Sequence, residues 1–161
     1  MSNRHPQEQC ILVWTALRHV HIRINAQLEM ALRDQCALSL SEFDAMAALY
    51  FCQPATVTVN ALAEAVNLSQ PATSRLLDRL EHRGWITRQR SGDDARQICL
   101  ELTDWGRQQT ARAISLHGEI VRESLSAKLS SEDHQQLLTI LSRLNPRQSA
   151  PPAIHSPADR T

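Results

Sequence analysis

A single short stretch with an alternating pattern separates two long regions with a helical pattern, and this order restricts the fold strongly. Between about residues 86 and 102, polar and apolar side chains alternate around a polar turn, as in a β-hairpin. On both sides, apolar residues recur at steps of three and four, as on one face of an α-helix. The chain has only four Gly and two Phe, too few turn residues and strand formers for a β-sandwich or barrel. The sequence therefore predicts a mainly α fold with one small β-hairpin.

Long helices are expected at both ends of this chain. The first spans about residues 6–36, and its length favours packing against a second chain as well as against its own core. The second helix is expected to begin after Ser41 as its N-cap. The region of about residues 103–145 contains two more helices, which we expect to follow the N-caps Thr103 and Ser130. The apolar stripe of the first helix consists of Cys10, Trp14, Leu17, His21, Ile24, Leu28 and Ala31.

Two shorter helices are expected between the second helix and the hairpin. Thr58 is the N-cap candidate of the first helix. Asn67 follows this helix, and asparagine tolerates the left-handed backbone conformation that ends many helices. Ser69 is the N-cap candidate of the second, which carries Pro71 in its first turn and ends at Gly84. The order short helix, tight turn, helix, hairpin is a winged helix-turn-helix. We place the helix-turn-helix at about residues 58–83 and the wing at about residues 86–102.

The second of these short helices has the composition of a DNA recognition helix. Its first turns carry small polar groups followed by guanidinium groups, which suit base edges and phosphates. Its opposite face is apolar and is expected to hold the helix to the core. The DNA contacts predicted for this helix are Ser69, Gln70, Thr73, Ser74, Arg75 and Arg79. Those predicted for the wing are Arg88, Arg90, Asp94 and Arg96.

Positive charge is concentrated in this part of the chain. The formal net charge of the whole chain is zero, but residues 69–100 hold six Arg and four acidic residues. Basicity is therefore local, where DNA would lie. Arg96 is the candidate for insertion into a narrow minor groove, and Asp94 is expected to orient Arg96 or Arg75. The alternative is that these charges form an ordinary solvated turn and helix face.

Several short motifs in this region resemble the MarR family of transcription regulators (multiple antibiotic resistance regulators). They run from the first short helix through the wing to the start of the next long helix, and one departure is Val66, where Leu is usual. The resemblance covers about residues 6–145. The matching residues are Leu62-Ala63, Ser69, Ser74-Arg75, Asp78, Leu80-Glu81, Gly84-Trp85-Ile86, Arg88, Asp94-Ala95-Arg96, Leu102-Thr103 and Gly106.

The resemblance implies a homodimer that binds a double-stranded, pseudo-palindromic DNA operator. The helices at about residues 6–36 and 103–145 would interlock as dimerisation helices, and two recognition helices would enter successive major grooves. Each wing would reach an adjacent minor groove. Such a regulator is more often a repressor than an activator.

The family also implies a sensor, for which the sequence offers two alternatives. Members of the family commonly respond to a small-molecule effector, often aromatic, and here Trp14 and His21 are the candidate pocket residues. The alternative is that His21 is a core or interface histidine that needs no ligand. Other members respond to cysteine oxidation, and Cys10 is the redox candidate because it lies near the start of the first helix. The ordinary explanation for each of the four cysteines is a small buried apolar residue.

Other classes of function lack their sequence signals. No nucleophile elbow, phosphate-binding glycine loop or metalloprotease motif occurs, so we expect no enzyme, no metal and no cofactor. No signal-peptide core and no membrane span are visible, which favours the cytoplasm. The proline-rich segment 146–161 is expected to be a disordered tail. The rival from another class is a winged-helix protein-interaction module without specific DNA binding.

Overall fold

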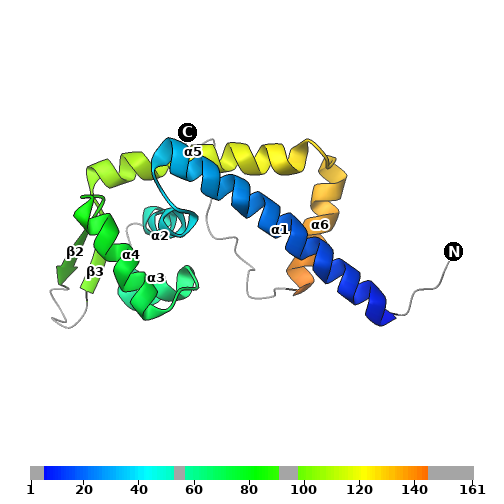
Figure 1. Cartoon of the computed structure of the whole chain (residues 1–161), viewed down its shortest axis with the longest axis horizontal. Helices are drawn as coiled ribbons and strands as arrows, with labels where there is room; N and C mark the ends of the chain where they lie inside the picture. Colours follow the sequence, from blue (N-terminus) through cyan, green and yellow to red (C-terminus); the bar gives the residue numbers. More distant parts are fainter. Residues whose placement is uncertain (1–5, 53–56, 91–97, 145–161) are drawn as a thin grey trace.

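The computed structural model describes residues 6–52, 57–90 and 98–144, and over these ranges the chain is mainly helical with a small sheet (Figure 1). This confirms the predicted fold class. The helices are α1 (Pro6–Cys36), α2 (Leu40–Phe51), α3 (Val59–Ala65), α4 (Gln70–His82), α5 (Asp104–Ser126) and α6 (Ser131–Leu144). The strands are β1 (Val57–Thr58), β2 (Ile86–Arg90) and β3 (Ile98–Leu102).

The helix-turn-helix follows the predicted boundaries closely. The Thr58 side chain accepts a hydrogen bond from the backbone N–H of Ala61 and so caps α3. Asn67 has a φ of 52° and Gly84 has a φ of 68°, so both take the left-handed conformation that turns the chain after a helix. Ser69 occupies the N-cap position of α4 without a side-chain capping hydrogen bond. These local signals therefore place both helices correctly.

The N-cap of α2 is Ser39, so the prediction of Ser41 is wrong. The Ser39 hydroxyl accepts from the backbone N–H of Glu42, and the Glu42 carboxylate accepts from the backbone N–H of Ser39 at 3.0 Å. This reciprocal capping box satisfies two backbone donors that the start of a helix leaves free. It explains why the helix begins two residues earlier than expected.

The sheet has three strands in the order β1-β3-β2, where the sequence predicts only the hairpin β2-β3. Both pairings are antiparallel, with Val57 opposite Leu100 and Ile86 opposite Leu102. Strand β1 has two residues, which is too short for an alternating pattern to reveal it. It ties the start of α3 to the wing.

The core lies where α2, α3, α4, α5, the sheet and the last turns of α1 meet. Leu32, Phe43, Met46 and Leu77 are among its fully buried side chains. The apolar stripe predicted for α1 enters this core only in its C-terminal half. Trp14, near the other end, is 66% exposed.

The N-terminal part of α1 and the whole of α6 leave large apolar side chains uncovered by the part of this chain that is described. Figure 1 shows α1 and α5 both extending away from the core, with α6 following the far end of α5. No residue of α6 is buried. The exposed apolar residues of the two helices are Ile11, Leu12, Val13, Trp14, Val20, Ile22 and Met30 in α1, and Leu137, Leu138, Ile140, Leu141 and Leu144 in α6.

Candidate nucleic-acid interface

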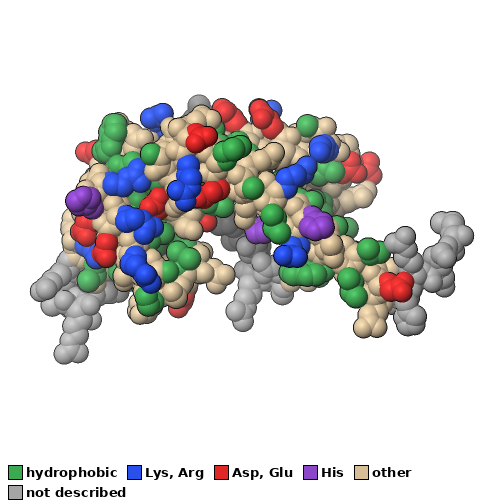
Figure 2. Space-filling view, in the orientation of Figure 1, with side chains coloured by type: hydrophobic (Ala, Val, Ile, Leu, Met, Phe, Trp, Pro, Cys, Tyr) green, Lys and Arg blue, Asp and Glu red, His purple; other side chains and the backbone are tan. Residues whose placement is uncertain are grey.

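Helix α4 separates its polar and apolar residues as the prediction requires. Leu76, Leu77 and Leu80 are buried in the core. Ser69, Gln70, Ser74 and Arg75 are all exposed on or just before the first two turns. A space-filling view shows basic side chains gathered over the region of α4 (Figure 2). The exposed side of α4 therefore carries hydrogen-bonding groups and positive charge together.

Thr73 does not belong to this exposed set, so its assignment as a DNA contact is wrong. Its side chain is fully buried, and its hydroxyl donates to the backbone carbonyl of Ser69 at 3.1 Å. The cause is helical geometry. Thr73 lies three to four residues before Leu76 and Leu77 and therefore shares their inward face.

Arg75 and Arg79 differ in the hydrogen-bond partners of their guanidinium groups. The Arg75 Nε donates to the carbonyl of Pro71 in its own helix, at 3.3 Å, and its side chain is otherwise exposed. The Arg79 Nε donates to the Glu42 carboxylate of α2 at 3.0 Å, and its Nη1 donates to the carbonyl of Arg75. Arg75 is thus presented to solvent, whereas Arg79 is already engaged by an acidic group.

Arg88 is also engaged by acidic groups. Its Nη2 donates to the Asp78 carboxylate, and its Nε lies 3.2 Å from a carboxylate oxygen of Glu81. Both acids belong to α4, so this cluster binds strand β2 to that helix. A DNA contact by Arg88 would have to compete with two carboxylates, and it stays a prediction.

The rest of the predicted wing contacts cannot be placed. Arg90 ends β2 opposite Ile98, but its side chain is not described. Asp94 and Arg96 lie outside the described residues. Their DNA contacts stay predictions.

The family-like residues Thr103 and Gly106 anchor the wing to α5. The Thr103 hydroxyl accepts from the backbone N–H of Gly106 at 2.9 Å and donates to the carbonyl of Gly84 at 2.8 Å. The Thr103 N–H donates to the carbonyl of Trp85 at 3.0 Å. This anchor joins the start of α5 to the turn that ends α4, so it fixes where the wing leaves the helix.

Sequence reasoning missed Glu42, which is among the most connected side chains near α4. Its side chain is 9% exposed, and its carboxylate binds the backbone N–H of Ser39 and the guanidinium of Arg79. Burial alone would raise the pKa of Glu42, but these hydrogen bonds outweigh burial and hold the pKa below its ordinary value. The signal that could have found it is the S-x-x-E spacing of Ser39 and Glu42, which is typical of a capping box.

The predicted sensor residues lie apart from the core. Trp14 and His21 are both exposed on α1, and the His21 Nε2 is 3.0 Å from the Asn25 Nδ2. Cys10 and Cys52 are exposed, so the expectation of a buried residue is wrong for these two within one chain. Cys36 and Cys99 are buried as expected, and burial raises the pKa of the Cys36 thiol. Within one chain, the thiols of Cys10 and Cys52 are therefore accessible to solvent, whereas those of Cys36 and Cys99 are not.

The described ranges contain neither a metal-binding cluster nor a membrane-spanning helix. Among those residues, no group of three or more His, Cys, Asp or Glu side chains is arranged to hold a metal ion. None of the helices described has both the length and the apolar character needed to cross a bilayer.

Comparisons with known proteins agree with this geometry. The family model described as MarR family matches residues 38–98. The chain is 30% identical over 135 residues to the HTH-type transcriptional regulator PecS of Dickeya dadantii, an alignment that covers 83% of this chain and 80% of PecS. It is 33% identical over 96 residues to the organic hydroperoxide resistance transcriptional regulator of Bacillus subtilis, covering 60% of this chain and 63% of that relative.

Solved structures of MarR family regulators share the fold. AbsC from Streptomyces coelicolor superposes with a TM-score of 0.77 at 22% identity, covering 91% of this chain and 97% of AbsC. Sco3205 from the same organism, solved in complex with DNA, superposes with a TM-score of 0.79 at 20% identity, covering 93% of this chain and 94% of Sco3205. The chain therefore belongs to the MarR family, whose members are DNA-binding transcription regulators.

Proposed function

We propose that this protein is a homodimeric repressor that binds a pseudo-palindromic operator sequence-specifically, and that a small-molecule effector changes its DNA affinity. The observation that carries the proposal is the two-sided character of α4. Three leucines fix one side in the core, and the other side presents Gln70, Ser74 and Arg75 to solvent. A helix held in this way can enter a major groove with its first turns against the base edges.

Arg75 is the described residue best placed to contact DNA. Its guanidinium can donate two parallel hydrogen bonds to a guanine or contact a phosphate. We expect Arg75→Ala to weaken operator binding by about 10- to 100-fold, which corresponds to roughly 1–3 kcal/mol. Fluorescence anisotropy with a labelled operator measures the effect. The control is Arg122→Ala on α5, which removes the same charge away from α4; equal losses in both variants would contradict the assignment.

The proposal of a homodimer rests on the uncovered apolar side chains of α1 and α6. So many large apolar side chains exposed on two helices are unusual in a monomer and mark an interaction surface. A two-fold dimer would place its two α4 helices about 34 Å apart, one turn of the DNA helix. Repression then follows by occupancy, because a dimer spanning two half-sites blocks access to that stretch of DNA. We place this action in the cytoplasm.

Selection from a pool of random duplex DNA at near-physiological salt tests the proposed function directly. An inverted repeat among the recovered sequences supports a sequence-specific dimer and identifies candidate promoters. Recovery of no motif would favour the protein-interaction module. The two also differ in salt dependence, because phosphate contacts make log K fall steeply with log salt.

The effector is proposed to be a small molecule, such as an aromatic acid, bound where α1 meets the partner chain. Trp14 offers an aromatic surface and His21 a polar ring on the same helix, and both are exposed in one chain. A pocket at this place would be completed by the second copy. A ligand with different affinities for the DNA-competent and DNA-incompetent arrangements would shift the equilibrium between them.

Oxidation of Cys10 is the second candidate for the sensor. This thiol is exposed on α1, and the relative from Bacillus subtilis is named as a regulator of organic hydroperoxide resistance. If Cys10 is the sensor, mild treatment with an organic hydroperoxide lowers operator affinity in the wild-type protein. The variant Cys10→Ser then keeps its affinity. Unchanged affinity of the wild-type protein after treatment would dispose of this candidate.

A further inference from the structure

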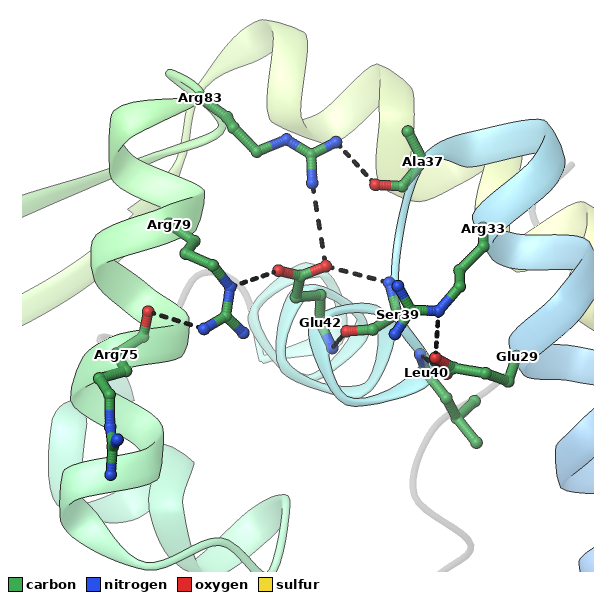
Figure 3. A network of polar contacts seen from close by, with 9 residues as sticks. All are labelled: Glu29, Arg33, Ala37, Ser39, Leu40, Glu42, Arg75, Arg79 and Arg83. Carbon is green, nitrogen blue, oxygen red and sulfur yellow. Dashed lines mark hydrogen bonds and ion pairs between the residues drawn. The ribbon is translucent and has the colours of Figure 1, made fainter.

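A buried carboxylate links α4 to the junction between α1 and α2. Figure 3 shows Glu42 of α2 between two guanidinium groups of α4 and the first residues of its own helix. The Arg79 Nε donates to the Glu42 Oε1 at 3.0 Å, and the Arg83 Nη1 lies 3.8 Å from the Oε2. The same Oε2 accepts from the backbone N–H of Ser39 at 3.0 Å. One side chain therefore caps α2 and contacts both Arg79 in the last turn of α4 and Arg83 at the C-cap of that helix.

Arg83 extends the link to the end of α1. Its Nη2 donates to the backbone carbonyl of Ala37 at 2.8 Å, and Ala37 has a φ of 53° in the turn that follows α1. Its guanidinium carbon lies 3.6 Å from the centroid of the Trp85 ring, at the entry to β2. The cluster of Glu42, Arg79 and Arg83 thus connects α1, α2, α4 and the wing.

The cluster lies where it can fix the orientation of α4. The backbone of α4 packs chiefly against α3 and β2, which are both parts of the DNA-binding lobe. The leucines of α4 also share the apolar core with α1 and α2. At the α1–α2 junction itself, the link to α4 runs through charged side chains around Glu42, whose side chain is 9% exposed. Ion-pair hydrogen bonds at a mostly buried carboxylate are directional and stronger than neutral ones.

We propose that Glu42 is a positioning residue for operator recognition, because it fixes α4 relative to the α1–α2 junction and keeps Arg79 and Arg83 away from DNA phosphates. This inference rests on the proposed function, since it assigns Glu42 a role in how the dimer reads its operator. In a two-fold dimer, the position of α1 would determine how the two DNA-binding lobes are placed relative to each other. The rigidity of the Glu42 link then sets which half-site spacing both α4 helices can reach.

The test compares Glu42→Gln with Glu29→Gln in the full-length protein. Glutamine at position 42 keeps an oxygen that can cap Ser39 but loses the charge that holds the two arginines. Glu29 is the matched control, since its carboxylate accepts from the backbone N–H of Leu40 at 2.6 Å and pairs with Arg33 of its own helix. Both variants therefore change the same charge at the same junction, and the Glu29 contacts described here involve α1 and α2 but no residue of α4.

Two measurements are made on each protein. The first is affinity for the selected operator and for inverted repeats with the spacer lengthened or shortened by one and two base pairs. The second is the salt dependence of binding to a fixed non-specific duplex. In Glu42→Gln, preference for the native spacing over the altered ones falls by about tenfold, an ordinary size for coupling between sites. The slope of log K against log salt steepens by about one to two, as the released guanidiniums bind phosphates. Glu29→Gln matches the wild-type protein in both.

Arg79→Gln keeps the test decisive if Glu42→Gln is too unstable for binding assays. This substitution removes the ion pair between Arg79 and Glu42 and leaves the Glu42 carboxylate in place to cap α2. We expect it to broaden the spacing preference without steepening the salt dependence. A slope flatter than wild type by about one would mean that Arg79 already contacts a phosphate, which overturns the proposal.

The proposal and the proposed function fail in different ways. If Glu42→Gln and the wild-type protein have the same spacing preference and the same salt slope, Glu42 does not position α4. If the wild-type protein selects no operator, the proposed function is wrong. The salt slope on the fixed duplex then decides alone whether Glu42 withholds the two arginines: a slope unchanged from wild type in Glu42→Gln overturns this inference, and a steeper one supports it.

Discussion

Replacing Gly106 with alanine is expected to lower the free energy of unfolding by about 3 kcal/mol or more, the upper range for overpacking a buried site. A Cβ atom built on Gly106 would overlap the carbonyl oxygen of Trp85 and lie 2.9 Å from its carbonyl carbon. Both are backbone atoms, so no side chain can rotate away. The first turn of α5 or the Trp85 peptide would have to shift.

That shift would break the anchor between the wing and α5. The carbonyl of Trp85 accepts the backbone N–H of Thr103 at 3.0 Å, and the Thr103 hydroxyl caps Gly106. Moving either partner costs these hydrogen bonds in addition to the steric strain. We therefore also expect Gly106→Ala to weaken operator binding, because the anchor sets the direction in which the wing leaves α4.

Gly118→Ala is the matched control for this prediction. Gly118 lies in the same helix, and a Cβ atom there would meet nothing within 4 Å. The same substitution is therefore expected to stabilise the protein, by roughly 0.5–1 kcal/mol from helix propensity alone. Equilibrium denaturation in urea, at one protein concentration, measures both variants. If Gly106→Ala were as stable as the wild-type protein, the close approach to Trp85 would be wrong.

Placing two glutamates on the apolar face of α6 is expected to convert a dimer into monomers. Leu137 and Leu141 are four residues apart on one face, and each is 37% exposed in the single chain. Covering the exposed third of each leucine in an interface contributes only about 0.5–1 kcal/mol. Burying two unpaired carboxylates in their place costs considerably more. We expect Leu137→Glu with Leu141→Glu to lower operator affinity by more than about 100-fold, because a monomer binds only one half-site.

Light scattering coupled to size-exclusion chromatography measures the outcome against the 18.1 kDa of one chain. The control carries the same two charges at Gln135 and Ser142, which lie on another side of α6 and are both exposed. That variant is expected to stay dimeric and to bind the operator. A leucine variant that remains dimeric would contradict the proposed use of α6.

Local chemistry made much of this fold predictable. Three helix boundaries are set by local residues that act as expected. The side chains of Thr58 and Thr103 accept hydrogen bonds from the first turn of the following helix, and Asn67 takes a left-handed backbone conformation. Apolar periodicity likewise identifies the buried side of α4. Ser39 was missed because Ser41 offers the same hydroxyl two residues later, and only the position of Glu42 distinguishes them.

At the candidate interface, the contacts that the sequence did not reveal involve partners that are distant in the sequence. Arg79 and Glu42 are 37 residues apart, and Arg88 meets Asp78 across the turn that ends α4. Residue type predicts that an arginine is available to bind an anion, but it does not show whether the protein already supplies one. Thr73 is a different case, since its place beside Leu76 and Leu77 on the helical repeat already indicated that it faces the core.

Because α1 is one continuous helix, it can act as a rigid rod that amplifies small rotations. Its 31 residues form one helix with one end in the core and the other uncovered, a rod of about 46 Å. Tilting such a rod by about 5° about its buried end moves the free end by roughly 4 Å, slightly more than the ~3.4 Å rise of one base pair along a DNA strand. A small rotation at the buried end is therefore amplified into a step of the size that separates neighbouring registers on DNA.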